Sequence, residues 1–182
     1  MPLLFTSLLE AGGGFPPPSP PPVFEIVGEP NAAGSAGSTH NFQAANILAQ
    51  RYTTGVAGRI VSLFAYFHGT GTPSFRMSLY ADAGSLPGGL LAVVEGVAPG
   101  AQGWHEFALD PAHQLDVTDA TVLWIGAQTS VNIDSRAPSG GIANSGRRLR
   151  SVTFGNGAPD PFGSSSTYTN TRGLRMKIRL NP

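Results

Sequence analysis

The side chains that most often carry enzyme chemistry are spread thinly through this sequence. The four histidines stand apart, without the HxH or HExxH spacing that brings two imidazoles onto one zinc ion. No GxSxG segment provides a serine nucleophile, and the Gly-rich loops PSGGIANSG and GNGAPDPFG lack the Lys-Ser/Thr pair of a phosphate-binding loop. A glycosidase needs two carboxylates across a cleft, but nothing pairs Glu95 with Glu106, which lie on separate predicted strands. The sequence therefore predicts a protein that is not an enzyme and uses no cofactor.

One acidic residue has a neighbourhood that could suit a calcium ion. Calcium needs several oxygen ligands that converge on one loop. Asp82 is followed by the turn-rich residues 83–87, whose carbonyl oxygens could complete such a set. An aspartate at a strand end more commonly stabilises the turn itself. No metal site is therefore predicted, and a loop-stabilising calcium ion stays open.

The composition points to an all-β protein. The 182 residues include 24 Gly and 16 Pro, only 12% are charged, and 41% are hydrophobic. Many turn residues between short apolar runs are typical of strands joined by tight loops. There is no cysteine, which excludes disulfides and thiolate chemistry.

Alternating hydrophobicity predicts a jelly-roll-like antiparallel β-sandwich of about eight strands in residues 23–182, preceded by an extended N-terminal arm. Residues 31–41, 132–146 and 156–170 are expected to be loops. The expected strands are Asn46–Thr54, Arg59–His68, Phe75–Asp82, Leu90–Gly96, Trp104–Leu109, Ala120–Ser130, Arg147–Gly155 and Gly173–Leu180, and Val23–Val27 could form a first strand.

The expected strands differ in which faces they bury. Residues 59–68 are apolar on both faces, so we expect both to be buried, whereas residues 75–82 have the period of a half-buried strand. Trp104 and Trp124 lie in alternating strands and are expected in the core; a sugar-binding platform would need one of them exposed. The last strand is the clearest: Leu174, Met176, Ile178 and Leu180 are expected inward, and Arg175, Lys177 and Arg179 outward.

Some side chains are predicted to contact a ligand or a neighbouring molecule. Two aromatic residues in the last long loop are placed for such contact, and the outward cations of the last strand could meet an acidic polymer. Nucleic acid is not favoured, because no aromatic residues for base stacking are interleaved with these cations. The predicted contact residues are Phe162, Tyr168, Arg175, Lys177 and Arg179.

A family resemblance rests on five segments in a recurrent order: QRYTTG, GRIVSLFAYF, FRMSLYADAGSLPGGLLA, GWHEFAL and ATVLWIGAQ. Together they resemble jelly-roll β-sandwich modules of phage and prophage structural proteins, which also occur in some secreted bacterial surface proteins. The resemblance covers residues 50–128. It implies the fold, a use in adhesion, decoration or glycan binding, and a homo-oligomer, with a trimer favoured.

The N-terminal residues are predicted to form an anchor. Residues 1–15 carry six large apolar residues, which need a partner to bury them. Residues 16–22, PPPSPPP, are expected to form a stiff polyproline II spacer. An SH3-type partner is disfavoured because no basic residue flanks the prolines. The anchor residues are Leu3, Leu4, Phe5, Leu8, Leu9 and Phe15.

Charge is distributed unevenly along the chain. Residues 1–30 contain three glutamates and no basic residue, whereas residues 147–182 contain seven basic residues and one acid. Such asymmetry suits head-to-tail contact between copies or contact with an anionic surface. The alternative is a solvated strand face.

These features predict a phage virion structural protein, of the capsid-decoration or head-fibre type, assembled in the host cytoplasm. Residues 1–22 would bind the major capsid protein or another virion protein, and the sandwich would be displayed, with a host-surface glycan as a potential ligand. No secretory signal or membrane span is expected, because no apolar run is long enough. Two alternatives stay open: a tail-fibre or receptor-binding component, and a secreted carbohydrate-binding module.

Overall fold

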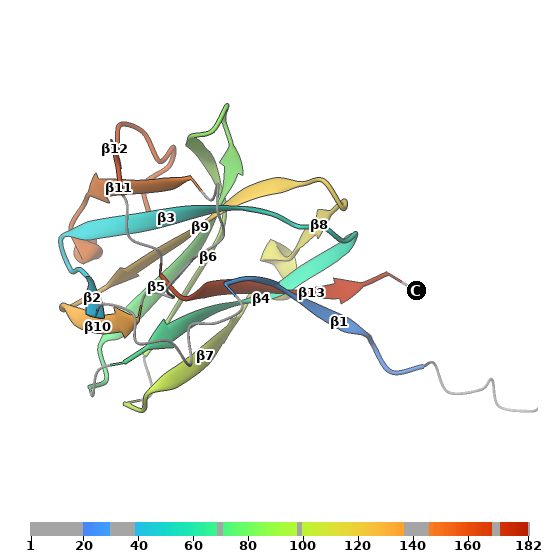
Figure 1. Cartoon of the computed structure of the whole chain (residues 1–182), viewed down its shortest axis with the longest axis horizontal. Coiled ribbons are helices and arrows are strands. Elements are labelled where there is room, and N and C mark those ends of the chain that lie inside the picture. The colour runs from blue at the N-terminus through green and yellow to red at the C-terminus, as the bar shows by residue number, and fades with distance from the viewer. Residues whose placement is uncertain are drawn as a thin grey trace, which may run out of the picture.

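The structure is a computed structural model that describes residues 20–29, 39–68, 71–97, 100–136, 146–168 and 172–181. These residues form thirteen antiparallel-paired strands and two short 3-10 turns, arranged as a sandwich of two sheets (Figure 1). The all-β prediction is confirmed. The predicted anchor, residues 1–15, and most of the proline spacer lie outside the described residues.

Two large sheets and one small ribbon make up the sandwich. The first sheet has the order β1-β13-β4-β7, with β8 also paired to β4, and the second has the order β12-β11-β3-β9-β5-β6. The first sheet contains β1 (Phe24–Gly28), β13 (Leu174–Leu180), β4 (Gly58–Phe67), β7 (Gly103–Ala108) and β8 (Leu115–Val117). The second contains β12 (Ser166–Thr167), β11 (Arg147–Ser151), β3 (Asn46–Thr53), β9 (Val122–Thr129), β5 (Ser74–Asp82) and β6 (Pro87–Val97). The ribbon pairs β2 (Thr39–Phe42) with β10 (Ile133–Arg136), and the 3-10 turns are η1 (Pro111–His113) and η2 (Phe154–Asn156).

The main core lies between the two sheets, where alternate residues of facing strands meet. Four phenylalanines from β2, β4, β5 and β7 pack at one end of it, with ring centroids 4.7 Å apart for Phe67 and Phe75 and 5.2 Å apart for Phe42 and Phe75. β13 contributes Leu174, Met176 and Ile178, as its alternation predicts.

A β-bulge in β4 changes which of its residues face the core. Lys177 pairs with Ser62 but the next residue, Ile178, pairs with Ile60, so Val61 is the extra residue on β4. The bulge lets Ile60 point inward together with Leu63, although the two are separated by an odd number of positions. A strict period of two assigns Ile60 to the opposite face from Leu63, and the structure corrects that assignment.

A second, smaller core lies on the outer side of the second sheet. Residues 152–163, which we call the strap, cover this side, and Phe162 of the strap is fully buried (0% exposed). Its ring packs edge-on against Tyr80, with centroids 5.1 Å apart. The other buried members of this core are Ile47, Ala49 and Trp124.

The strap overturns two expectations. β5 was predicted to be half-buried, yet both of its faces are buried, because the strap covers Arg76, Ser78 and Tyr80. Phe162 was predicted to contact a ligand or neighbour, yet it is a core residue of this same chain. A loop rich in Gly, Pro and Ser can therefore contribute to a core when one large apolar side chain fixes it to a sheet.

The small ribbon corrects two predicted loops. Residues 132–146 contain β10, and β2 begins within residues 31–41. Each of these strands is four residues long, which is too short for hydrophobic alternation to stand out from the surrounding turn residues.

Candidate binding surface

The outer face of the first sheet collects the cations that the sequence predicted to point outward. Directly opposite residues of antiparallel strands share a face of the sheet. Arg175, Lys177 and Arg179 of β13 lie opposite Phe64, Ser62 and Arg59 of β4, and opposite Gly28, Ile26 and Phe24 of β1. We call this surface the aromatic–cationic face; its members are Phe24, Arg59, Phe64, Trp104, Arg175, Lys177 and Arg179.

Trp104 lies on this face rather than in the core. On β7 the even-numbered residues Trp104 and Glu106 share the outer face, whereas Phe107 is buried between the sheets. The guanidinium carbon of Arg175 lies 3.7 Å from the centroid of the Trp104 ring. The alternating pattern correctly predicted a strand at Trp104. It does not show whether the even- or the odd-numbered residues of that strand face inward, so the expectation that Trp104 lies in the core was wrong. Trp124, by contrast, is fully buried, as predicted.

Lys177 joins an aromatic ring and a carboxylate across this sheet. Its Nζ lies 4.7 Å from the centroid of the Phe24 ring and 3.2 Å from Glu106 Oε1. Ser62 Oγ donates a second hydrogen bond to Glu106 Oε1, at 2.6 Å. Side chains of four strands, β1, β13, β4 and β7, are thus linked across the outer face.

Arg59 forms the most exposed ion pair of the face. Its guanidinium donates two hydrogen bonds to Asp116 of β8, at 2.6 and 2.7 Å. This pair lowers the pKa of Asp116 below its usual value. Lys177 and Arg59 are therefore each paired with a carboxylate, so the predicted cationic stripe is partly neutralised by its own chain.

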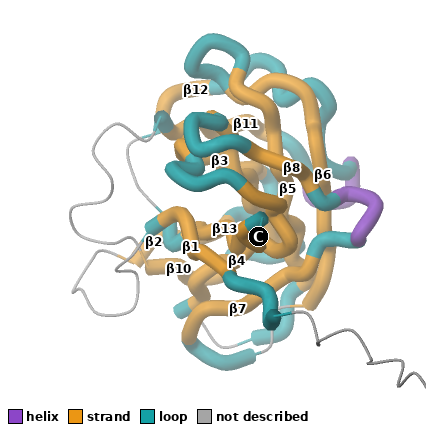
Figure 2. The backbone as a smooth tube through the Cα atoms, turned by 90° about the vertical axis from the view of Figure 1, so that its right-hand side faces the viewer, coloured by secondary structure: helices purple, strands orange, loops and turns teal. Residues whose placement is uncertain are grey.

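Aromatic rings and cations alternate on this surface, which the sequence did not predict. Phe24 comes from β1 and Trp104 from β7, on either side of the β13 cations. Their positions depend on the strand order, which brings segments from the two ends of the chain together. Figure 2 shows β1, β13, β4 and β7 following one another across this sheet.

Tyr168, the remaining predicted contact residue, does not join this surface. It follows β12 of the second sheet and is half-buried. Its hydroxyl accepts a hydrogen bond from Nη2 of Arg172, at 2.6 Å. Arg172 is itself buried, and this burial lowers the pKa of its guanidinium. The structure therefore separates Tyr168 and Phe162 from Arg175, Lys177 and Arg179.

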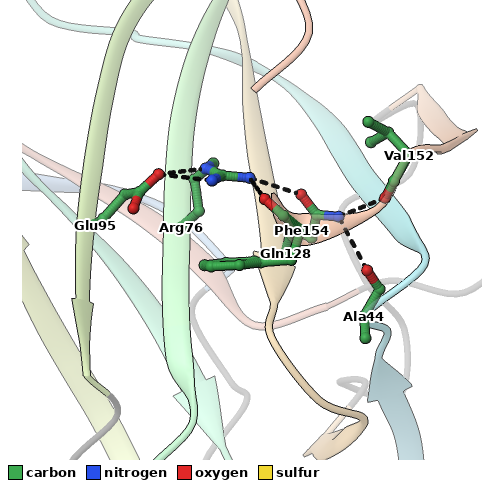
Figure 3. Close-up of polar contacts among 6 residues, drawn as sticks. All are labelled: Ala44, Arg76, Glu95, Gln128, Val152 and Phe154. Carbon is green, nitrogen blue, oxygen red and sulfur yellow. Dashed lines mark hydrogen bonds and ion pairs between the residues drawn. The ribbon is translucent and has the colours of Figure 1, made fainter. Parts of the chain in front are cut away.

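The opposite outer face holds a network that sequence reasoning missed. Arg76 of β5 is buried and donates to Glu95 Oε1 at 2.7 Å, to Gln128 Oε1 at 3.1 Å and to the backbone oxygen of Phe154 at 2.8 Å (Figure 3). Its guanidinium carbon also lies 4.3 Å from the centroid of the Phe154 ring. Arg76 thus ties the strap to the sheet. An arginine between buried residues of one strand was the only signal in the sequence.

Gln128 continues this network from β9. Its Nε2 donates to the backbone oxygens of Val152 at 2.6 Å and Ala44 at 3.2 Å (Figure 3). A buried amide that binds two backbone oxygens from distant segments fixes both of them. The role of this network is structural, since its polar groups are directed to one another.

The carboxylate of Asp82 is occupied by hydrogen bonds from its own chain. Its carboxylate accepts hydrogen bonds from Arg51 Nε at 2.8 Å and from the indole nitrogen of Trp124 at 2.8 Å. The Arg51 hydrogen bond is the main reason that the pKa of Asp82 falls to about 2. Asp82 also accepts a hydrogen bond from the backbone nitrogen of Ser85, the turn-stabilising role weighed for it from sequence. Over the part of the chain that the structure describes, no group of three or more His, Cys, Asp or Glu residues could hold a metal ion.

No family model and no curated protein sequence matches this chain. The resemblance to phage jelly-roll modules therefore stays a prediction. In the described residues, no helix is long and apolar enough to cross a membrane.

Proposed function

We propose that this protein is a phage virion structural protein of the capsid-decoration or head-fibre type. Residues 1–22 bind the major capsid protein or another virion protein, and the β-sandwich is displayed as a non-catalytic head. This placement includes assembly in the host cytoplasm and a homo-oligomeric head.

The observation that carries this proposal is the place where the chain enters the sandwich. The first described strand, β1, is an end strand of the first sheet, and it follows the proline spacer directly. The chain before β1 can therefore bind another protein without displacing any strand of the core. Figure 1 shows β1 running outward from the body of the sandwich toward the N-terminal end.

Exposed apolar side chains continue from the spacer into β1. Val23 is 63% exposed, Phe24 42% and Ile26 44%. Phe24 and Ile26 share the outer face of the sheet, and neighbouring exposed apolar side chains of this kind are typical of a contact. In the sequence these residues follow the apolar residues 1–15 and the proline spacer, as expected where an anchored segment joins its head.

Deletion of residues 1–22 tests the anchor. We expect the truncated protein to lose incorporation into particles, as measured by its stoichiometry in purified virions. Its circular dichroism spectrum and unfolding midpoint should match those of the full chain, because β1 remains. A matched control replaces Pro16, Pro17 and Pro18 with alanine and keeps the apolar residues, and it should still incorporate. Full occupancy by the truncated protein would refute the anchor.

Glycan binding is a second candidate, favoured by Trp104, which is half-buried on the outer face of the first sheet. An aromatic ring beside cationic side chains on a flat sheet can contact a sugar ring and its acidic substituents. This reading fits both a receptor-binding component and a carbohydrate-binding module. Glycan-array binding that Trp104→Ala removes and the exposed-site control Val131→Ala keeps would support it. An array without signal above background would refute it.

A further inference from the structure

We propose that the head self-associates by adding β1 of one copy to the free edge of β7 of a second copy. The two strands are the two ends of the first sheet, so the sheet continues from copy to copy. The occupant of each edge is thus a second copy of this chain. No described strand pairs with the other side of β1 or of β7.

β1 is an edge strand with little protection against pairing with another strand. Natural proteins protect edge strands with charges, prolines or bulges, because an edge offers unpaired backbone groups. β1, FEIVG, carries one charged residue and has no bulge in its pairing with β13. Phe24 and Ile26 are exposed on its outer face.

The free edge of β7 lies beside an open groove that could hold a strand of a second copy. An open groove runs along it, lined by residues 94–97 of β6 and 104–108 of β7. Val97, at the rim of this groove, is 62% exposed. The groove thus combines a strand edge with an exposed apolar side chain, which are also the two properties of β1.

The direction of the strands favours pairing between these two edges. Each neighbour in the order β1-β13-β4-β7 is antiparallel, so β1 and β7 run in opposite directions. Rotation about an axis parallel to the strands keeps the direction of every strand. Two copies related by such a rotation can therefore place β1 of one copy antiparallel to β7 of the other. Such head-to-tail contacts close into a ring when the rotation permits.

In both edge strands, residues of the same parity direct their backbone N–H and C=O groups to the free side. Leu180 N donates to Val23 O, and Leu109 N donates to Val61 O. The odd-numbered residues of β1 and β7 thus bond within the sheet, and the even-numbered residues direct their N–H and C=O groups to the free side. Because the even-numbered side chains of both strands lie on the outer face, the pairing keeps that face continuous.

The residue that lies opposite Glu25 distinguishes the possible registers. Phe24 opposite Glu106 and Ile26 opposite Trp104 of the second copy put Glu25 opposite His105. A shift of two residues in one direction puts Glu25 opposite Phe107, where the carboxylate faces an aromatic ring. A shift in the other direction puts Glu25 opposite Gly103, the first residue of β7, so that Phe24 and Glu25 are the only residues of β1 left opposite this strand.

A two-fold pairing of β1 with itself is the competing arrangement. It would send the two N-terminal segments in opposite directions, whereas rotation about the strand axis sends all of them the same way. Binding of all arms to one particle surface requires the common direction. The preference for β1–β7 pairing over the two-fold arrangement is the one part of the inference that rests on the proposed function.

Disulfide trapping in the full chain tests the pairing. The chain has no cysteine, so Glu25→Cys and His105→Cys each introduce a single thiol. Opposite residues of a non-hydrogen-bonded pair have Cα atoms about 4.5 Å apart, within the range of a disulfide. An equimolar mixture oxidised with copper phenanthroline should yield a linked dimer that contains one chain of each variant.

Each outcome of the trapping experiment decides for or against the pairing. A disulfide in the mixture that neither variant forms alone supports β1 beside β7. Self-linking of Glu25→Cys alone would replace the proposal with the two-fold arrangement, and no link in any sample would overturn it.

Light scattering of the unoxidised full chain gives a second readout. The full chain should have a mass that is a multiple of the monomer, and Ile26→Lys should reduce it to the monomer by placing a charge on the edge. Val131→Lys, at a residue that is 56% exposed elsewhere, should leave the mass unchanged. A mass unaffected by Ile26→Lys would contradict the proposal. Particle incorporation, measured separately with the 1–22 deletion, can fail without affecting either readout.

Discussion

The two outer faces of the sandwich are built from similar strands, but one is covered by another segment of the chain and the other is open. The strap covers the outer face of the second sheet, where Arg76, Ser78 and Tyr80 of β5 are all buried. On the first sheet, Arg179 and Phe24 remain exposed. The comparison teaches that the outward residues of a strand do not by themselves tell whether that face is a surface or a second core.

The polar groups on the two faces differ in the same way. On the covered face, Arg76 donates to the backbone of the strap and holds it in place. On the open face, Lys177 and Arg59 pair with Glu106 and Asp116, whose side chains are 42% and 65% exposed. Ion pairs exposed to water contribute little to stability, whereas buried hydrogen bonds to charged groups contribute more. Matched substitutions on the two faces should therefore have unequal effects.

The largest difference is expected between Phe162 and Phe24. Phe162→Ala empties a buried site and should lower the free energy of unfolding by about 3–5 kcal/mol. Phe24→Ala removes an exposed ring and should change it by less than about 0.5 kcal/mol. Urea unfolding of both variants measures the two values. Equal effects would mean that the strap is not part of the core.

The next difference is expected between Arg76 and Lys177. Arg76→Met removes hydrogen bonds that hold the strap and leaves Gln128 without one of its partners, which should cost about 2–3 kcal/mol. Lys177→Met breaks an exposed pair and should cost less than about 0.5 kcal/mol. The same unfolding experiment applies.

Hydrogen exchange then shows where the protection is lost. Arg76→Met should speed exchange of the amides of Phe154 and Phe162 in the strap, and Lys177→Met should leave them unchanged. If exchange in the strap did not respond to Arg76→Met, other contacts, such as the burial of Phe162 and the hydrogen bond from Gln128 to Val152, would hold the strap.

The smallest difference is expected between two Asp–Arg pairs at acid pH. The pKa of Asp82 in the folded protein, about 2, lies below its unfolded value. Asp82 therefore stabilises the fold above pH 4, and this contribution is lost as the pH falls from about 4 to 2. It should be on the order of 1 kcal/mol, because the pair is partly exposed.

Two variants check this assignment. Asp82→Asn should flatten the fall in unfolding free energy between pH 4 and pH 2, measured by urea unfolding at each pH. Asp116→Asn, on the open face, should leave the acid profile close to that of the parent. A steeper dependence on Asp116 than on Asp82 would reverse the comparison.

The sequence predicted the sandwich where strands are long and alternate cleanly. β13 is the best case, since Leu174, Met176 and Ile178 face the core and three cations face outward. The bulge at Val61 escaped prediction because it depends on the pairing partner rather than on β4 itself. β2 and β10 escaped because four residues carry too little periodicity.

The candidate surface could be predicted only in part. The cations of β13 were visible from their alternation, but Trp104 and Phe24 reach the same face through the strand order, which no local pattern encodes. Phe162 was misassigned because its loop composition indicated a surface, whereas its contact with Tyr80 and its place in the second core decide its burial. The predicted anchor, Leu3 to Phe15, stays a prediction, since it lies outside the described residues.

The strap also determines where the head can accept foreign sequence. Residues 152–163 have the composition of a loop that protein engineers would choose for inserting a peptide epitope. Their backbone is nevertheless bonded to Arg76 and Arg150, and Phe162 N donates to Gly88 O at 2.9 Å. An epitope placed there would displace part of a core, whereas the turn η1, none of whose residues is buried, offers a better site for display.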